Sequence, residues 1–340
     1  MNKLFSLTLL SFSLSVFNSV SADEVILKNG SRLLGEVLNK DGSYLEFKTP
    51  FAGTLKINWT NIVELILDKP VKLMLDDQSI IMADKLKNKD DLMTISQPGE
   101  AVTRTIKQTQ VAYINPDPWR LGKGYKMSGY ANVSLKSQHG NTDKDQFDMD
   151  GKIAFRRVND RLTFRGEYED DKSNNIQSSL NWLFLGKYDY FVNKKTYLGG
   201  SALFEHDEFS DLELRETYGL FVGHQYFESK QLNLDLEVGL AQVYEDFIES
   251  EDNDFLAGTW SLKYDQYFFA EFVQLYHRQL GRLDLENTNK YIFKSWTGAR
   301  FPLAFGFSVS GEVQADYDSQ PAADAHRTDT TYLFKLGYEF

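Results

Sequence analysis

Tyr332-Leu-Phe-Lys-Leu-Gly-Tyr-Glu-Phe340, at the C-terminal end, is the stretch that decides the fold class of this chain. An apolar side chain stands at every second position, so a β-strand would place all of them on one face. A soluble sandwich seldom exposes such a strand, because an open aromatic edge invites aggregation. A barrel closed in a lipid bilayer has no edge and gives the aromatic face an apolar environment. The pattern predicts the last strand of a bacterial outer-membrane barrel, with an assembly signal formed by Tyr332, Phe334, Leu336, Tyr338 and Phe340.

The N-terminal end has the features of a secretory signal peptide. One positive charge at Lys3 precedes an apolar core, Leu4 to Phe17, and Val20-Ser21-Ala22 resembles a cleavage site. We expect residues 1–22 to be removed and the mature chain to begin near Asp23. The chain has no cysteine, which excludes disulfides and a lipid anchor on cysteine. No later apolar run is long enough to predict a membrane helix.

Composition is consistent with a β-rich envelope protein and argues against one class of partner. Aromatic residues make up 14% of the chain, which favours strands and the aromatic girdles of a barrel. The formal net charge is −12, so we expect no nucleic acid partner. We find no motif for a cofactor, and the acidic loops lack the ligand spacing of a calcium site.

An internal repeat occupies the first part of the mature chain, residues 23–114. Val25 to Glu36 aligns with Leu73 to Asp84 at an offset of 48 residues, and the same offset pairs Val63 with Val111 and Ile66 with Ile114. Alternating apolar residues and polar turns predict strands joined by hairpins in each copy. We interpret this segment as a small duplicated β-domain similar to Sm-like or SH3-like barrels. Residues 115–124, with two prolines and two glycines, are expected to be a linker.

Residues 125–340 have a different pattern, with longer runs in which apolar and polar residues alternate. An apolar face of about ten residues per run suits a tilted strand that crosses the hydrocarbon layer. The whole chain is therefore predicted to be all-β, with a transmembrane antiparallel β-barrel of about twelve strands after the duplicated domain. The expected strands lie near 126–138, 146–156, 160–170, 175–191, 195–206, 212–227, 231–244, 255–267, 270–281, 290–301, 304–317 and 329–340.

The connections between these runs alternate in length, which predicts the orientation of the barrel. Short turns such as 157–160 alternate with longer polar loops such as 246–254. Outer-membrane barrels keep their short turns in the periplasm. An even number of strands would then place the N-terminal domain in the periplasm of a Gram-negative bacterium, where its partner is unknown. The outer face and the loops would contact outer-membrane lipid and lipopolysaccharide.

Three features of this second region resemble a known family. They are Gly140-Asn-Thr142 at the end of the first strand, Leu214-Arg215 followed by Gly219 and Gly223 on one face, and the aromatic terminus. Over about residues 125–340 the chain resembles the salt-induced outer membrane protein family, also catalogued as a domain of unknown function. The resemblance implies an outer-membrane β-barrel with a possible link to salt or osmotic stress. It implies no catalytic residues.

Charged residues on the inward face are the clearest functional signal. Charges of both signs could form a salt-bridged plug or line a narrow polar pore, and a barrel of about twelve strands allows either. Gly219, Gly223 and Gly239 would leave local space on that face and favour a passage. The predicted inward-facing residues are Lys152, Arg165, Glu167, Glu169, Glu213, Arg215, Asp235, Glu237, Glu312 and Asp316, together with Arg156, Lys263 and Asp265.

An enzymatic barrel is the alternative hypothesis. A lipid hydrolase would need a histidine and a serine on one strand face, and no histidine here has a serine at a suitable spacing. A protease at the extracellular rim could use Asp170-Asp171 with His206-Asp207. Solvated rim charges are far commoner than a protease site, so we expect a non-enzymatic barrel of channel or envelope-integrity type. A structural barrel whose periplasmic domain docks a partner is a further alternative.

Overall fold

The computed structural model of the chain describes residues 22–99, 103–138, 144–174, 176–229, 231–269, 271–321 and 326–340. The predicted signal peptide lies outside these residues except for Ala22, as do His139 and Gly140-Asn-Thr142. The chain divides into two compact units, Met1–Pro116 and Asp117–Phe340. No helix in the described part of the chain is long and apolar enough to cross a membrane.

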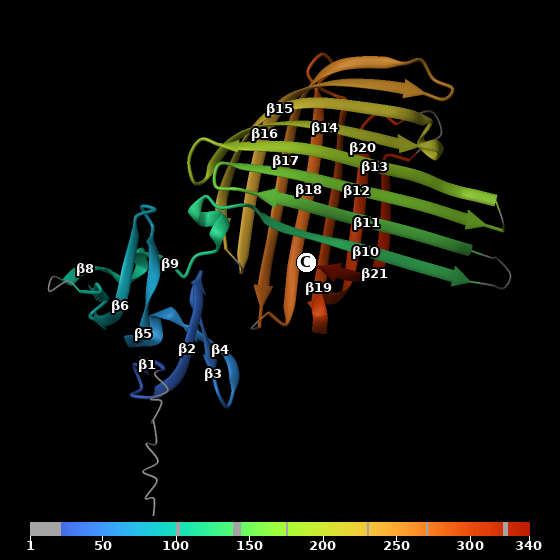
Figure 1. Ribbon diagram of the computed structural model, residues 1–340. Coiled ribbons are helices and arrows are strands. Elements are labelled where there is room, and N and C mark those ends of the chain that lie inside the picture. Colours follow the sequence, from blue (N-terminus) through green and yellow to red (C-terminus); the bar gives the residue numbers. More distant parts are fainter. Residues whose placement is uncertain are drawn as a thin grey trace, which may run out of the picture. The chain divides into compact units, whose positions relative to one another are not determined.

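The second unit is a closed antiparallel barrel of twelve strands, so the expectation of about twelve strands is confirmed (Figure 1). Each strand pairs with its neighbours in sequence, and the last strand pairs with the first. The strands are β10 (Lys126–Gln138), β11 (Lys144–Arg156), β12 (Asp160–Ser173), β13 (Ile176–Phe191), β14 (Thr196–Asp207), β15 (Leu212–Glu228), β16 (Leu232–Phe247), β17 (Asn253–Phe268), β18 (Val273–Asp284), β19 (Tyr291–Pro302), β20 (Phe307–Asp318) and β21 (Thr328–Glu339).

Most of the predicted boundaries lie within a few residues of those observed, and two differences have a local cause. β20 begins at Phe307 and not at residue 304, because Ala304–Gly306 form a 3-10 turn (η5) with Phe305 at φ 60°. The turn between β17 and β18 contains no obvious turn residue in the sequence. Phe269 and Glu271 make that turn, with φ values of 51° and 72° in the left-handed region.

The connections at the two ends of the barrel differ as expected at most positions, but not between β12 and β13, which residues 174 and 175 join at the end with the longer loops. Lys126 at the start of β10 pairs with Arg156 at the end of β11, so the turns 157–159, 192–195, 229–231 and 303–306 share the end at which β10 begins. The longer connections 248–252, 285–290 and 319–327 lie at the other end. A second 3-10 turn, η4 (Glu208–Ser210), joins β14 to β15 at that end.

The seam between the first and last strands closes the barrel with a short register. Tyr130, Ala131, Asn132 and Val133 of β10 pair with Glu339 to Leu336 of β21. Beyond the ladder, Gly129 and Phe340 exchange backbone hydrogen bonds of 2.8 and 3.0 Å. The register of β10 with β11 is much longer, from Lys126 to Gln138. The C-terminal residue of the chain thus takes part directly in closing the barrel.

The first unit is one sheet built from the two sequence repeats. β1 pairs with β2 and β5, and β9 pairs with the same two strands, so these four strands form a closed ring. The elements are β1 (Asp23–Leu27), β2 (Arg32–Asp41), β3 (Tyr44–Thr49), β4 (Gly53–Asn58), η1 (Trp59–Asn61), β5 (Ile62–Leu75), β6 (Ile80–Lys89), β7 (Leu92–Ser96), β8 (Thr103–Lys107), η2 (Gln108–Gln110) and β9 (Val111–Ile114).

The repeats share a strand and a core, so neither forms a closed unit alone. The long β5 ends the first repeat and begins the second, and one apolar cluster contains Leu45 and Phe47 as well as Leu73 and Ile95. The equivalent turns η1 and η2 exchange hydrogen bonds: Trp59 Nε1 donates to the Gln108 carbonyl (3.1 Å), and Gln108 Nε2 donates to the Trp59 carbonyl (2.7 Å).

One part of the predicted repeat alignment is wrong by a residue. The buried partners of Val111 and Ile114 in the first repeat are Ile62 and Leu65, and not Val63 and Ile66. Their offset is therefore one residue longer than at the start of the repeat, because the connection between β7 and β8 is longer than the one between β3 and β4.

The predicted linker contains ordered structure. Asn115 belongs to the first unit, since its amide donates to the Leu38 carbonyl at 3.1 Å. A short 3-10 turn, η3 (Pro118–Leu121), follows and buries Trp119. The guanidinium groups of Arg120 and Arg156 lie 4.4 and 5.7 Å from the centre of the Trp119 ring, so this turn is attached to the barrel.

Candidate functional site: the charged interior of the barrel

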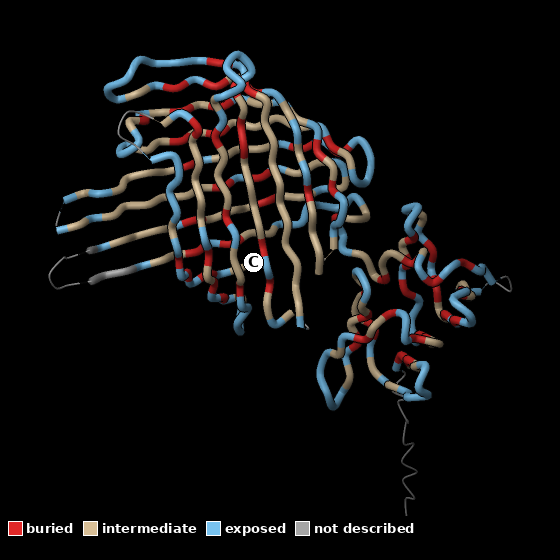
Figure 2. Tube along the Cα trace, turned by 180° about the vertical axis from the view of Figure 1, so that it is seen from behind, coloured by how far each residue is buried: buried red, intermediate tan, exposed pale blue. Residues whose placement is uncertain are grey.

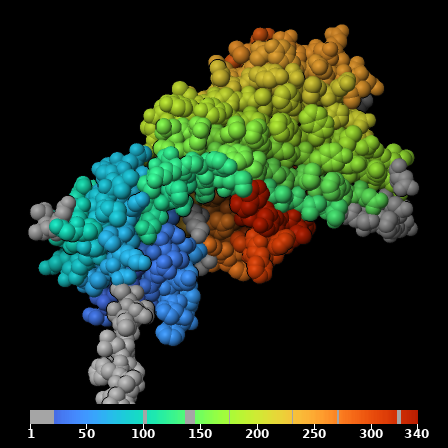
Figure 3. Space-filling model, viewed as in Figure 1, coloured from blue at the N-terminus to red at the C-terminus, as the bar shows by residue number. Residues whose placement is uncertain are grey.

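The two faces of the barrel wall have the reverse of a soluble protein's polarity. On β20 Val309 is 42% exposed whereas Ser310 is 5% exposed, and on β21 Phe334 is 85% exposed whereas Lys335 is 5% exposed. Burial alternates in this way along the strands (Figure 2), and the space-filling view shows the outer side of the wall as a continuous surface (Figure 3). Apolar residues outside and polar residues inside fit a barrel with lipid outside. The predicted terminal residues Tyr332, Phe334, Leu336, Tyr338 and Phe340 all lie on the outer face.

Lys335 is the centre of an ion cluster behind the closing seam. Its Nζ lies 2.7 Å from both Asp150 Oδ1 on β11 and Glu312 Oε1 on β20. Asn132 Nδ2 donates to Asp150 at 3.1 Å, and the Tyr276 hydroxyl donates to Glu312 at 2.8 Å. Because Asp150 lies two strands away across the seam, this cluster links β21 to β11 as well as to β20.

A second cluster occupies the wall formed by β12 to β16. Lys187 of β13 contacts Glu237 of β16, which also accepts a hydrogen bond of 2.6 Å from the Tyr197 hydroxyl. Arg161 Nε lies 2.6 Å from Asp189 Oδ2, and its guanidinium stands 5.1 Å from the Tyr197 ring centre. Tyr197 is fully buried, so aromatic and charged groups together fill this part of the interior.

A third cluster lies nearer the long loops. Arg282 contacts Glu205 and donates to the Thr217 hydroxyl at 3.1 Å. Lys294 Nζ is 3.8 Å from Glu205 and 3.3 Å from Asp316. The same end contains Glu245, which accepts from Arg215 at 2.7 Å and from Lys290 at 2.6 Å.

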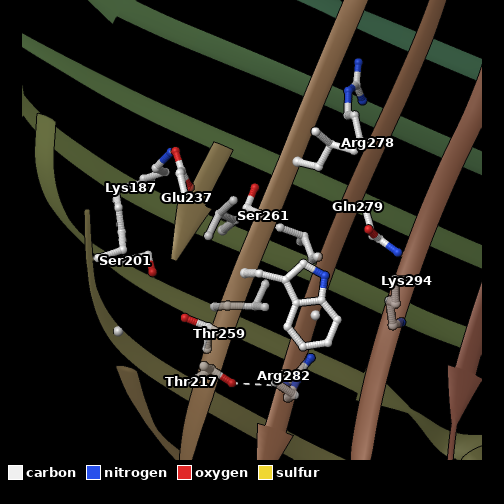
Figure 4. Close-up of a pocket in the computed structure, with 18 of the residues that line it drawn as sticks. Lys187, Ser201, Thr217, Glu237, Thr259, Ser261, Arg278, Gln279, Arg282 and Lys294 are labelled. Carbon is white, nitrogen blue, oxygen red and sulfur yellow. Dashed lines mark hydrogen bonds and ion pairs between the residues drawn. The ribbon is translucent and has the colours of Figure 1, made fainter. Parts of the chain in front are cut away.

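Among the residues that the structure describes, two of the hollows lie between these clusters. The middle hollow has a volume of about 180 Å³, and the hollow nearer the loops has about 210 Å³. Glu205, Ile292 and Lys294 line both, so the contacts of Glu205 with Arg282 and Lys294 form the partition between them. Figure 4 shows the middle hollow, with Lys187 beside Glu237 on one side and Arg278 and Lys294 on the other.

The lining of the middle hollow contains more cations than carboxylates, although the whole chain is acidic. Eight of its described lining residues are cations and three are carboxylates, and four more carboxylates just outside the lining, Glu167, Asp189, Asp265 and Asp316, lie at ion-pair distance from five of the cations. The cations are Lys152, Arg161, Arg165, Lys187, Lys263, Arg278, Arg282 and Lys294, and the carboxylates are Glu205, Asp235 and Glu237. A recess lined by one sign of charge within a low-dielectric wall concentrates ions of the opposite sign.

The structure brings most of the predicted inward-facing residues to the interior. Lys152, Arg165, Asp235, Glu237 and Lys263 line the middle hollow, and Arg215 and Asp316 line the other. Glu312 lies in the Lys335 cluster, Glu167 contacts Arg165, and Glu169 accepts from Asn181 at 3.0 Å. Arg156 lies over the Phe191 ring, and Asp265 accepts from Asn233 at 3.1 Å.

Glu213 does not follow the predicted alternation. The register shifts between Leu212 and Leu214, so Glu213 is the extra residue of a bulge, and it is exposed. Leu212 takes an inward position instead and lines the hollow nearer the loops.

The glycine-based expectation of open space is wrong at two of three positions. A Cβ on Gly223 would lie 2.3 Å from the Tyr197 ring, and one on Gly239 would lie 2.8 Å from the Phe221 Cβ. The Tyr197 ring therefore occupies the space at Gly223, and the backbone of Leu220 and Phe221 on the neighbouring strand occupies it at Gly239. Gly219 alone of the three lines the middle hollow.

Several interior residues were not among the predicted ones. Arg161, Lys187, Glu205, Arg278, Arg282 and Lys335 stand at inward positions of their strands, and the same period-two alternation could have identified them. Their partners could not be identified in that way, because a contact such as Lys187 with Glu237 joins strands that are not neighbours.

The residues proposed for an enzymatic rim point in different directions. His206 stacks on Trp182 with ring centres 5.9 Å apart, and its Nδ1 lies 2.6 Å from the Glu213 carbonyl oxygen. Asp207 instead accepts hydrogen bonds from Ser210, at 3.1 Å from the amide and 2.7 Å from the hydroxyl. Asp171 accepts from Gln146 at 2.7 Å. Within the described ranges no group of three His, Cys, Asp or Glu side chains is arranged to hold a metal ion.

Comparison with known proteins identifies the family of the barrel. Residues 131–340 match the family model described as "Protein of unknown function, DUF481". The chain belongs to the DUF481 family. No curated protein matches the sequence.

Solved structures similar to this DUF481 protein include porins and a channel. The KdgM porin has 12% identity and a TM-score of 0.35, with 63% of this chain and 99% of that chain covered. The NanC porin has 9% identity and a TM-score of 0.38, with the same shares covered. The CymD monoaromatic hydrocarbon channel has 8% identity and a TM-score of 0.30, with 66% and 90% covered. Likeness at this level assigns no function to the DUF481 chain.

Proposed function

We propose that this DUF481 protein is a narrow outer-membrane channel for small polar solutes. The observation that carries the proposal is the pair of hollows inside the barrel, which meet at Glu205 and Lys294. A barrel that served only as a structural plug would gain nothing from an inward-facing cation such as Lys152, for which the described residues provide no carboxylate at ion-pair distance, because unpaired charge inside the barrel is costly. The ion pairs of Glu205 with Arg282 and Lys294 narrow the path between the hollows.

The experiment that tests the proposal is conductance of the purified full-length protein in planar lipid bilayers. The small hollows predict unitary currents well below those of open porins, which have wide aqueous lumens. Glu205→Gln should raise the unitary current, since it weakens the partition formed with Arg282 and Lys294. The absence of current from both proteins, after folding has been verified, would contradict the channel.

A sealed barrel of envelope-integrity type is the second candidate, and the dense ion clusters favour it. Lys335, Glu237 and Glu245 each contact at least two interior side chains, a degree of connection that also suits a plug. For this function, loss of the protein should make the outer membrane more permeable to bulky antibiotics. A channel of the proposed size should leave that permeability unchanged.

The orientation and partners are part of the same proposal. The first unit joins the barrel at the end with short turns, and in outer-membrane barrels that end faces the periplasm. The long loops would then meet lipopolysaccharide, and the terminal aromatic strand would be read by the barrel assembly machinery. We also propose that the repeats of the first unit are related to Sm-like or SH3-like barrels and that the domain docks a periplasmic partner. Protease added outside intact cells should leave the first unit uncut.

The stress link implied by the family resemblance and the absence of enzyme activity belong to this proposal too. If the channel carries small solutes during salt stress, deletion of the protein should change the rate at which cells resume growth after a shift in salt concentration. Purified protein should hydrolyse neither phospholipid nor peptide; rim-dependent hydrolysis that His206→Ala abolishes would instead support the enzymatic alternative.

A further inference from the structure

Four cations face one another across the middle hollow. Lys152 and Arg165 are register partners on β11 and β12, and Lys263 and Arg278 are register partners on β17 and β18. In a ring of twelve strands β11 stands opposite β17, and β12 stands opposite β18. All four side chains line the same hollow, and the charges of Lys263 and Arg278 act on Lys152.

This arrangement does not help the fold. Like charges directly opposite each other on neighbouring strands are destabilising, and here two such pairs also point at each other across the lumen. Within the described part of the chain, no carboxylate lies at ion-pair distance from Lys152 or Arg278. Arg278 instead donates to the Tyr130 hydroxyl and stands between the rings of Tyr130 and Tyr276, at 4.9 and 5.5 Å.

The remaining two cations are only partly neutralised. Lys263 Nζ lies 3.8 Å from Asp235 and 3.7 Å from Asp265, beyond hydrogen-bond distance. Arg165 contacts Glu167 and lies 4.2 Å from the Trp296 ring centre, and its buried Nε has no hydrogen-bond partner. Lys152, without a carboxylate at ion-pair distance, and the unpaired Arg165 Nε are therefore donors that a bound anion could use.

We propose that the middle hollow is a binding site for a small polyvalent anion, with Lys152, Arg165, Lys263 and Arg278 as its contact groups. Four cations on one hollow favour an anion with more than one charge. Lysine ammonium and arginine guanidinium groups bind carboxylate and phosphate oxygens alike. The hollow, with a volume of about 180 Å³, suits a small ligand, since a cavity of about 150 Å³ already holds benzene. Ser201, Thr259 and Ser261 add hydroxyl groups to the lining.

The inference rests on the proposed channel for its biological use but not for its test. Binding is measured by isothermal titration of the full-length protein in detergent, with citrate, inorganic phosphate, chloride and raffinose as probes. Citrate or phosphate should bind more tightly than chloride, and raffinose should not bind. The comparison of citrate with phosphate decides between carboxylate and phosphate chemistry. Chloride binding as tight as both would overturn the proposal of a polyvalent site.

Lys152→Gln is the decisive variant, because Lys152 has no partner that the substitution would leave unpaired. Citrate or phosphate binding should weaken about tenfold, since one charge-assisted contact is lost. The urea midpoint of unfolding should stay the same or rise, since a repulsive charge is removed. Lys194→Gln in an exposed turn makes the same charge change and should alter neither quantity. Loss of binding together with loss of stability would show a structural role and overturn the inference.

Bilayer recordings separate this inference from the channel itself. Anion binding without current would retain the site and refute the channel. Current that prefers cations, or that citrate does not block, would refute the site and retain the channel. Neither binding nor current would refute both.

Discussion

Replacing Lys335 by Met should destabilise the barrel strongly, because this lysine holds two buried carboxylates together. Asp150 and Glu312 each lie 2.7 Å from its Nζ, and all three side chains are almost inaccessible to solvent. Removing one member of a buried ion cluster costs about 3–5 kcal/mol. Both carboxylates retain neutral donors, Asp150 from Asn132 and Glu312 from Tyr276. We therefore expect a loss near the lower limit, about 3 kcal/mol, or about a hundredfold in the folded-to-unfolded ratio.

Urea titration of the protein in lipid vesicles measures this loss. The folded fraction is followed by the faster migration of the unheated barrel on SDS gels. Lys194→Met removes a lysine from an exposed turn and should change the free energy of unfolding by less than about 0.5 kcal/mol.

A compensating variant tests whether the carboxylates are the cause. Replacing the whole cluster, with Asp150→Asn and Glu312→Gln added to Lys335→Met, should recover most of the lost stability, since no unpaired charge remains. Lys335→Met as stable as the wild-type protein would refute the cluster and the inward position of Lys335.

Three further predictions concern the seam, the wall and the first unit. Deleting Phe340 removes both backbone hydrogen bonds to Gly129 and should lower the amount of folded barrel in the outer membrane. Phe305→Ala, at an exposed aromatic residue outside the strand, should not lower this amount. Equal amounts of folded barrel in the Phe340 deletion and the wild-type protein would contradict a role of the terminus in assembly. Val313→Arg, at an outward position near the middle of β20, should cost about 2–4 kcal/mol if lipid covers it, and a cost below about 1 kcal/mol in urea titration would exclude that. Burial lowers the pKa of Lys40 from 10.5 to about 8, so between these pH values the unfolded chain holds a proton that the folded chain has lost. The free energy of unfolding of the first unit should therefore rise as the pH rises from about 8 to 10.5. Pulse proteolysis measures this free energy, and in Lys40→Met it should not rise over that range.

The strand pattern was predictable because every barrel strand contacts two different environments. Lipid outside and polar groups inside impose a period of two on residues such as Phe307 to Glu312, and this pattern needs no knowledge of neighbouring strands. Turns made by residues in strained backbone conformations cannot be predicted from this alternation. Phe269 and Glu271 adopt left-handed conformations that their side chains do not indicate.

The contacts in the interior were not predictable, because they depend on how the strands stagger around the ring. Ser310 illustrates this: its register partners are Arg300 and Lys335, so an arginine there would meet two cations although Glu312 stands two residues away. Tyr197 likewise covers Gly223 on the next strand, which converts expected space into packing. In the first unit, the sequence repeat predicted two small β-units. Both repeats share β5, and their apolar side chains form one core.

The central claim, a wall with lipid outside and a polar lumen inside, is tested most directly by two spin labels at one depth. Ser201 lines the middle hollow, and Leu220 lies on the outer face of the neighbouring strand, where its register partner is Gly200. The chain has no cysteine, so a single Ser201→Cys or Leu220→Cys directs each label. In reconstituted vesicles the label at 220 should be relaxed by oxygen and shielded from a water-soluble nickel chelate, and the label at 201 should show the reverse preference. Equal accessibility at the two positions, in protein shown to be folded, would contradict the division of the wall into a lipid face and a lumen face.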